Sequence, residues 1–88
     1  METEFDLSGL TKRQKEVAKY LIENRGVRPM LRLDLFEKYV IIYPSYETTT
    51  EKVAKKVKEA LNLKEMPGYS VFPRMGVGGY AYTFEEYN

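Results

Sequence analysis

The spacing of the apolar residues changes along the chain, and this change restricts the fold more than any other feature. Apolar side chains recur at helical spacing in residues 10–22 and again in residues 50–61. After Pro67 and Gly68 the spacing becomes two, which is typical of strands. A chain of 88 residues can bury one small core, so these patterns predict a single α+β domain.

The first helix is predicted from Lys12 to Arg25. Thr11 and Gln14 have the spacing of a capping box, in which each side chain satisfies a backbone N–H group of the first turn. Gly26 stands where many helices end with a residue in the left-handed conformation.

A second helix is predicted from Leu31 to Tyr39, although Leu33 falls off its apolar side. Residues 40–47 follow, and their β-branched run leaves three alternatives open. They form a strand, an added helical turn or a dimer contact.

A third helix is predicted over residues 49–62, with Thr48 and Glu51 as its capping box. The period-two segment near the C-terminus predicts a β-hairpin. Its strands would be residues 69–75 and 80–84, which are joined by a glycine-rich tip.

The composition excludes several kinds of chemistry. The chain has no cysteine and no histidine, so it cannot form a disulfide, a Cys/His zinc site or a histidine general base. Gly76, Gly78 and Ala81 match the dinucleotide fingerprint formally, but a strand and not a helix is predicted after them. We therefore expect no enzymatic activity, no metal and no cofactor.

No membrane or export segment is predicted either. The longest apolar stretch, residues 40–43, is far shorter than the roughly 20 residues of a spanning helix. The acidic N-terminus lacks the apolar core of a secretory signal, so we expect an intracellular, cytoplasmic protein. The many lysines and glutamates lean toward a thermophilic source.

Charge is distributed unevenly, although the net charge is only +1. Residues 1–10 carry three acids and no base, whereas residues 11–62 carry 12 basic and 7 acidic residues. We therefore separate an acidic N-terminal arm, residues 1–10, from a domain of residues 11–88.

Two segments and the element order carry a resemblance to a known family. Residues 11–21, Thr-Lys-Arg-Gln-Lys-Glu-Val-Ala-Lys-Tyr-Leu, and residues 48–61, Thr-Thr-Thr-Glu-Lys-Val-Ala-Lys-Lys-Val-Lys-Glu-Ala-Leu, look like the first helix and the recognition helix of winged helix-turn-helix proteins. The chain is also similar in size and composition to small winged-helix regulators of archaea and their viruses. The resemblance implies three helices followed by a two-stranded β-hairpin. Residues 40–47 depart from the family, which usually has a short turn there.

The resemblance also implies a function, namely sequence-specific binding of double-stranded DNA by a transcriptional regulator. The third helix would enter the major groove and the hairpin would act as a wing. The predicted DNA-binding residues are Tyr46, Thr48, Thr49, Lys52, Lys55, Lys56 and Arg74. Arg28 and Arg32 are further candidates for phosphate contacts. The alternative for the lysines is a solvated surface that keeps the domain soluble.

A surplus of aromatic residues suggests that a second chain buries some of them. Small domains often gain stability in this way, so we expect a homodimer with Phe5, Leu7 and Leu33 at its contacts. The leading alternative function is a winged-helix module for protein–protein interaction, either in an assembly or as an inhibitor. A steep dependence of affinity on salt would favour DNA over a protein partner.

Overall fold

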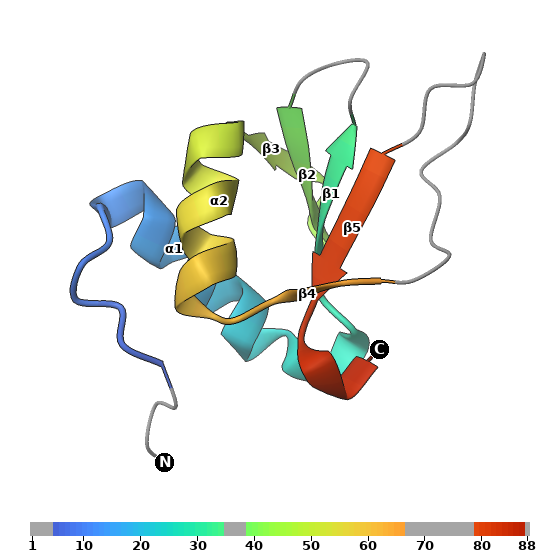
Figure 1. Cartoon of the computed structure of the whole chain (residues 1–88), viewed down its shortest axis with the longest axis horizontal. Helices are drawn as coiled ribbons and strands as arrows, with labels where there is room; N and C mark the ends of the chain where they lie inside the picture. The colour runs from blue at the N-terminus through green and yellow to red at the C-terminus, as the bar shows by residue number, and fades with distance from the viewer. Residues whose placement is uncertain (1–4, 35–38, 67–78, 88) are drawn as a thin grey trace.

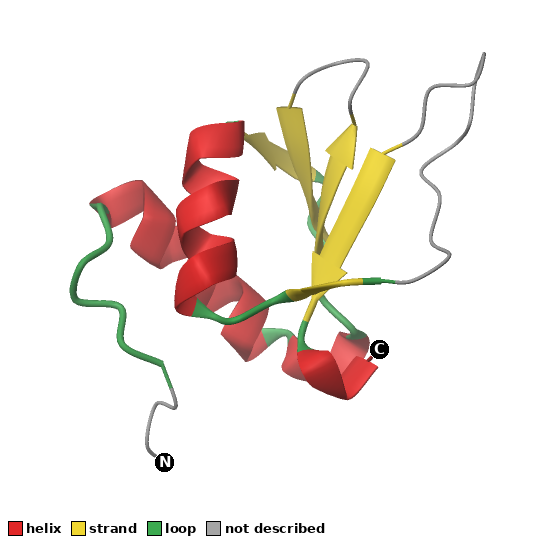
Figure 2. Cartoon of the chain, viewed as in Figure 1, coloured by secondary structure: helices red, strands yellow, loops and turns green. Residues whose placement is uncertain are grey.

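The computed structural model describes residues 5–34, 39–66 and 79–87, and in them two α-helices lie on one side of a five-stranded antiparallel sheet (Figures 1 and 2). The strand order in the sheet is β3-β2-β1-β5-β4. In chain order the elements are α1 (Lys12–Glu23), η1 (Arg25–Val27), β1 (Met30–Asp34), β2 (Tyr39–Tyr43), β3 (Glu47–Thr49), α2 (Glu51–Ala60), β4 (Lys64–Glu65), β5 (Gly79–Thr83) and η2 (Glu85–Tyr87).

The start of α1 confirms the predicted capping box. The Thr11 side chain accepts a hydrogen bond from the backbone of Gln14, and the Gln14 side chain accepts one from the Thr11 backbone at 2.9 Å. The predicted end is wrong, because α1 stops at Glu23 and a 3₁₀ turn follows. The Asn24 side chain and backbone both donate to the Tyr20 carbonyl, so the helix ends without a left-handed Gly26.

The predicted second helix, residues 31–39, is also wrong. Its first part belongs to β1, which pairs with β2 on one side and β5 on the other. The apolar Leu31 and Leu33 alternate with Arg32, which is the pattern of a half-buried strand. Residues 40–43 belong to β2, so the strand alternative for that segment is confirmed.

These findings overturn the winged helix-turn-helix fold. The chain is α+β, but it has two helices and a five-stranded sheet instead of three helices followed by a two-stranded hairpin. The predicted strand at residues 80–84 is confirmed as β5, and its neighbours in the sheet are β1 and β4. The predicted partner strand, residues 69–75, lies outside the described residues.

Helix α2 matches the predicted third helix in its position but not in its cap. Thr48 and Thr49 belong to β3, where they pair with Ile41 and Val40. Thr50 is therefore the N-cap, and its hydroxyl accepts a hydrogen bond from the Val53 backbone at 3.3 Å. Because the ladder with β2 uses the first two threonines, the predicted box of Thr48 and Glu51 is wrong.

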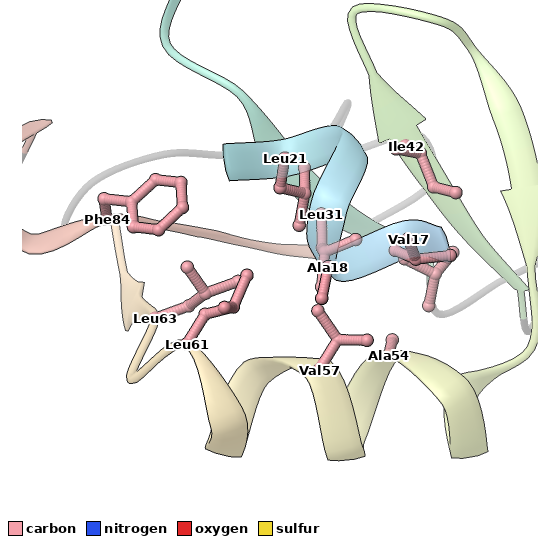
Figure 3. Packing of buried hydrophobic residues seen from close by; sticks show 11 residues of the cluster. Val17, Ala18, Leu21, Leu31, Ile42, Ala54, Val57, Leu61, Leu63 and Phe84 are labelled. Atoms are coloured by element: carbon pink, nitrogen blue, oxygen red, sulfur yellow. The ribbon is translucent and has the colours of Figure 1, made fainter. Parts of the chain in front are cut away.

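The main core lies between the helices and the sheet (Figure 3). Each helix turns one apolar side toward the strands, as the helical spacing predicts. The buried members are Val17, Ala18, Leu21, Leu31, Val40, Ile42, Ala54, Val57, Leu61, Leu63 and Phe84. A smaller cluster of Met30, Met66 and Ala81, with Tyr43 against it, is separate from this core.

Thr83 provides a test of the packing between β5 and the segment before β1. Its side chain is fully buried, and its hydroxyl donates a hydrogen bond to the Pro29 carbonyl. Thr83→Val keeps the shape and removes the donor, so we expect the free energy of unfolding to fall by about 1–3 kcal/mol in urea denaturation. The exposed strand residue Thr48 is the control, and Thr48→Val should change stability by no more than about 0.5 kcal/mol. If Thr83→Val were as stable as the wild type, the buried hydrogen bond from Thr83 to the Pro29 carbonyl would be contradicted.

Candidate nucleic-acid interface

Helix α2 carries four lysines on its solvent side. Its apolar residues Ala54 and Val57 are buried against the sheet and α1, which directs the remaining positions outward. Lys52, Lys55 and Lys56 are exposed and Lys58 is half-buried. We call these four residues the lysine side of α2.

The lysine side is only partly balanced by the acidic residues of the same helix, Glu51 and Glu59. In residues 5–34, 39–66 and 79–87, none of the four lysines forms an ion pair. Arg13 on α1 differs, because its guanidinium lies 3.5 Å from the Glu16 carboxylate and 3.9 Å from that of Glu47. The positive charge of α2 is therefore available to an external anion.

The helix layer as a whole is basic. Together α1 and α2 contain eight basic and four acidic residues, whereas the net charge of the whole chain is only +1. The two helices pack against each other, so their charges act on the same side of the molecule (Figure 1). Such an asymmetric distribution produces a positive field over one face despite the small net charge.

The predicted threonines do not join the lysine side. Thr48 pairs with Ile41, whose neighbours Val40 and Ile42 face the helices, so Thr48 points to the opposite face of the sheet. Thr49 is half-buried opposite Val40. Both residues precede α2, but only their backbone leads into the helix.

Tyr46 also lies away from α2. It occupies the turn before β3 with a positive φ of 63° and is 64% exposed. Its ring packs edge-on against Tyr43, with 5.6 Å between the ring centres. β3 separates Tyr46 from the start of α2, so it is not part of the lysine side.

The predicted arginines are distributed over other parts of the chain. Arg28 has a left-handed backbone, and its guanidinium donates to the Tyr87 carbonyl at 3.0 Å. Arg32 lies on β1 between Leu31 and Leu33, so it points to the sheet face without helices, and its buried Nε has no hydrogen-bond partner in the described chain. Arg74 is outside the described residues.

The residues predicted at dimer contacts pack within the chain. Phe5, Leu7 and Leu33 are half-buried against the main core. The Phe5 ring lies 5.9 Å from that of Phe84, and the Arg25 guanidinium lies above both rings. These contacts within the chain leave only part of each side chain exposed to a second copy. The homodimer stays a prediction.

A groove of about 210 Å³ opens between α2 and the sheet, next to the lysine side. We call it the α2–sheet groove. Its apolar lining consists of Leu31, Leu33, Val40, Ala54 and Tyr82. Its charged lining consists of Glu51, Lys55 and Lys58, all from α2.

Tyr82, from β5, lines the groove together with the lysines of α2. The Lys58 ammonium lies 4.5 Å from the centre of its ring, which is a cation–π contact. Burial raises the pKa of the Tyr82 hydroxyl above its ordinary value of 10.0, and the charges of Glu65, Tyr80 and Glu51 raise it further. The phenol therefore stays neutral at physiological pH.

Sequence reasoning missed this groove. Tyr82 was predicted as a strand residue in the core or at its edge, and its pairing with Leu31 across β1 and β5 brings it under α2. One signal was present: Glu51, Lys55 and Lys58 follow at spacings of four and three, which places them along one line of a helix. The small Ala54 beside that line leaves the space that the groove occupies.

The position of Tyr82 predicts a specific loss of stability at high pH. Because its pKa is raised in the folded state, the unfolded chain loses the phenol proton first as the pH rises. The stabilising contribution is complete below about pH 10 and is lost as the pH rises through the folded pKa. Urea denaturation at about pH 9 and about pH 11 should show a smaller decrease for Tyr82→Phe than for the wild type. The two proteins differ only at this hydroxyl, so identical decreases would contradict its burial.

No family model matches the chain, and no curated protein or solved structure matches it. The described residues contain no group of three or more carboxylates that could hold a metal ion. Neither α1 nor α2 has the length and apolar content that a membrane crossing requires. The function is therefore argued from the charges and surfaces of the chain itself.

Proposed function

We propose that the protein binds double-stranded DNA through the lysine side of α2 and acts in transcriptional control. One observation carries the proposal: four lysines on one ten-residue helix are without an ion pair in the described chain. Lysines in such a position supply the phosphate contacts that dominate the affinity of proteins for DNA. A cytoplasmic location is part of this proposal, because the DNA must be accessible.

The dimensions of α2 fit this use. Lys52 and Lys58 are six residues apart, so the lysine side extends about 9 Å along the helix axis, and duplex DNA carries one charge per roughly 1.7 Å of its axis. The ends of the lysine side can therefore reach different phosphates of one groove. Contacts of this kind give affinity without sequence information. Selectivity, which is also part of the proposal, requires additional contacts with base edges.

Charge reversal on α2 tests the proposal. We expect Lys52→Glu combined with Lys55→Glu to weaken binding to a fluorescent duplex by at least about tenfold at low salt, because two attractive contacts become repulsive. Fluorescence anisotropy gives the affinity, and circular dichroism shows whether the variant is folded. The wild-type affinity should fall with salt with a log–log slope of up to about −3.6, that is −0.9 for each of the four lysines.

The matched control compares two single variants with the same change in charge. Lys52→Glu alters the lysine side, whereas Lys64→Glu alters β4 in the sheet. Equal effects of these two variants would mean that only net charge matters and would refute α2 as the interface. Selection of bound fragments from random duplex DNA tests selectivity, and the absence of an enriched site would refute that part of the proposal.

A further inference from the structure

We propose that the α2–sheet groove is a docking site for an acidic peptide segment of a partner protein. The peptide inserts one large apolar side chain into the groove, and acidic residues flank that side chain in the peptide sequence. The inference is independent of DNA binding. It follows from the size of the groove, from the chemistry of its floor and from the charges along its rim.

The size of the groove suits one side chain. Its volume of about 210 Å³ is smaller than the roughly 300–1,000 Å³ of typical small-molecule sites. Protein interfaces, in contrast, often depend on single apolar anchors that fill small pockets. Tyr80 lies beside the groove, opposite Leu33 in the strand register, and is 43% exposed. It extends the apolar surface on which a bound peptide would lie.

The floor of the groove favours a peptide over a nucleic acid. The half-buried Leu33 and Tyr82 offer apolar surface to another apolar side chain, above a floor of Leu31 and Val40 that is already buried. Single-stranded nucleic acids are usually held by bases that stack on aromatic rings. Among the described residues that line the groove, Tyr82 supplies the one ring, and that ring is already in contact with the Lys58 ammonium.

The two lysines on the rim favour acidic residues of the peptide on their side of the anchor. Lys55 and Lys58 lie one helical turn apart, and neither forms an ion pair in the described chain. Glu51 lines the N-terminal end of α2, so carboxylates of the peptide should lie toward the two lysines and away from this residue. Glu65, on β4 beside Tyr82, disfavours carboxylates at the opposite edge.

The test is an NMR titration of the isotope-labelled full chain with short blocked peptides, without DNA. The first peptide has leucine at its centre and aspartate on both sides, and the second has alanine in place of the leucine. We expect the leucine peptide to shift the amide signals of groove residues, including Ala54 and Lys55, and to bind about fivefold more tightly or better. Equal affinity of the two peptides would overturn the proposal, because it would show binding to charge alone.

Two neighbouring lysines provide the matched variants. Lys55 lines the groove and Lys56 does not, although both are exposed on the same helix. Lys55→Glu should weaken binding of the leucine peptide at least about threefold more than Lys56→Glu, and Lys55→Gln serves if the glutamate variant does not fold. Equal weakening by both variants would overturn the proposal.

The same titration identifies other occupants. Groove signals that shift with protein concentration in the absence of peptide would assign the groove to a second copy of the chain. Groove signals that respond to single-stranded oligothymidylate but not to the leucine peptide would assign it to a nucleic acid. Either result would overturn the proposal.

Discussion

The burial of one sheet face under two helices is the interaction on which the other features depend. Leu31 of β1 and Ile42 of β2 project into the core, and Ala54 and Val57 of α2 meet them there (Figure 3). Val40 of β2 belongs to the same buried cluster. The contact between the strands and α2 determines which side of α2 is buried. A helix with a period of 3.6 residues cannot turn its lysines toward that core without exposing its apolar residues. The outward direction of the lysine side is therefore a consequence of core packing, and so is the space beside Ala54 that forms the α2–sheet groove.

The features that local patterns determine were predictable. The capping box of Thr11 and Gln14 and the apolar sides of both helices require only residues within a few positions of one another. The strand β1 was missed because a short run rich in leucine fits a helix or a strand equally well on local grounds. Its state is decided by pairing with β2 and β5, and β5 is far away in the sequence. The leucine that did not fit the predicted helix, Leu33, was the visible sign of this conflict.

The same distinction applies to the candidate site. The lysine side follows from the helical period alone, so three of its members, Lys52, Lys55 and Lys56, were predicted to act together. The positions of Thr48 and Thr49 depend on the register between β2 and β3, in which a shift of one residue exchanges the two faces of the sheet. No sequence pattern fixes that register. The groove depends on three segments, α2, β1 and β5, and on the volume of one alanine between them.

The charge distribution connects the two proposed uses of α2. The acidic residues that nearly balance the basic residues of the chain lie largely outside the two helices. The helix layer therefore keeps its positive field. Lys55 belongs both to the lysine side and to the rim of the groove. An acidic segment in the groove would neutralise part of the surface proposed for DNA. By thermodynamic linkage, a bound peptide would then lower the affinity for DNA by the same factor by which DNA lowers the affinity for the peptide. If both proposals hold, a partner in the groove controls the proposed phosphate contacts of α2 without any change in fold.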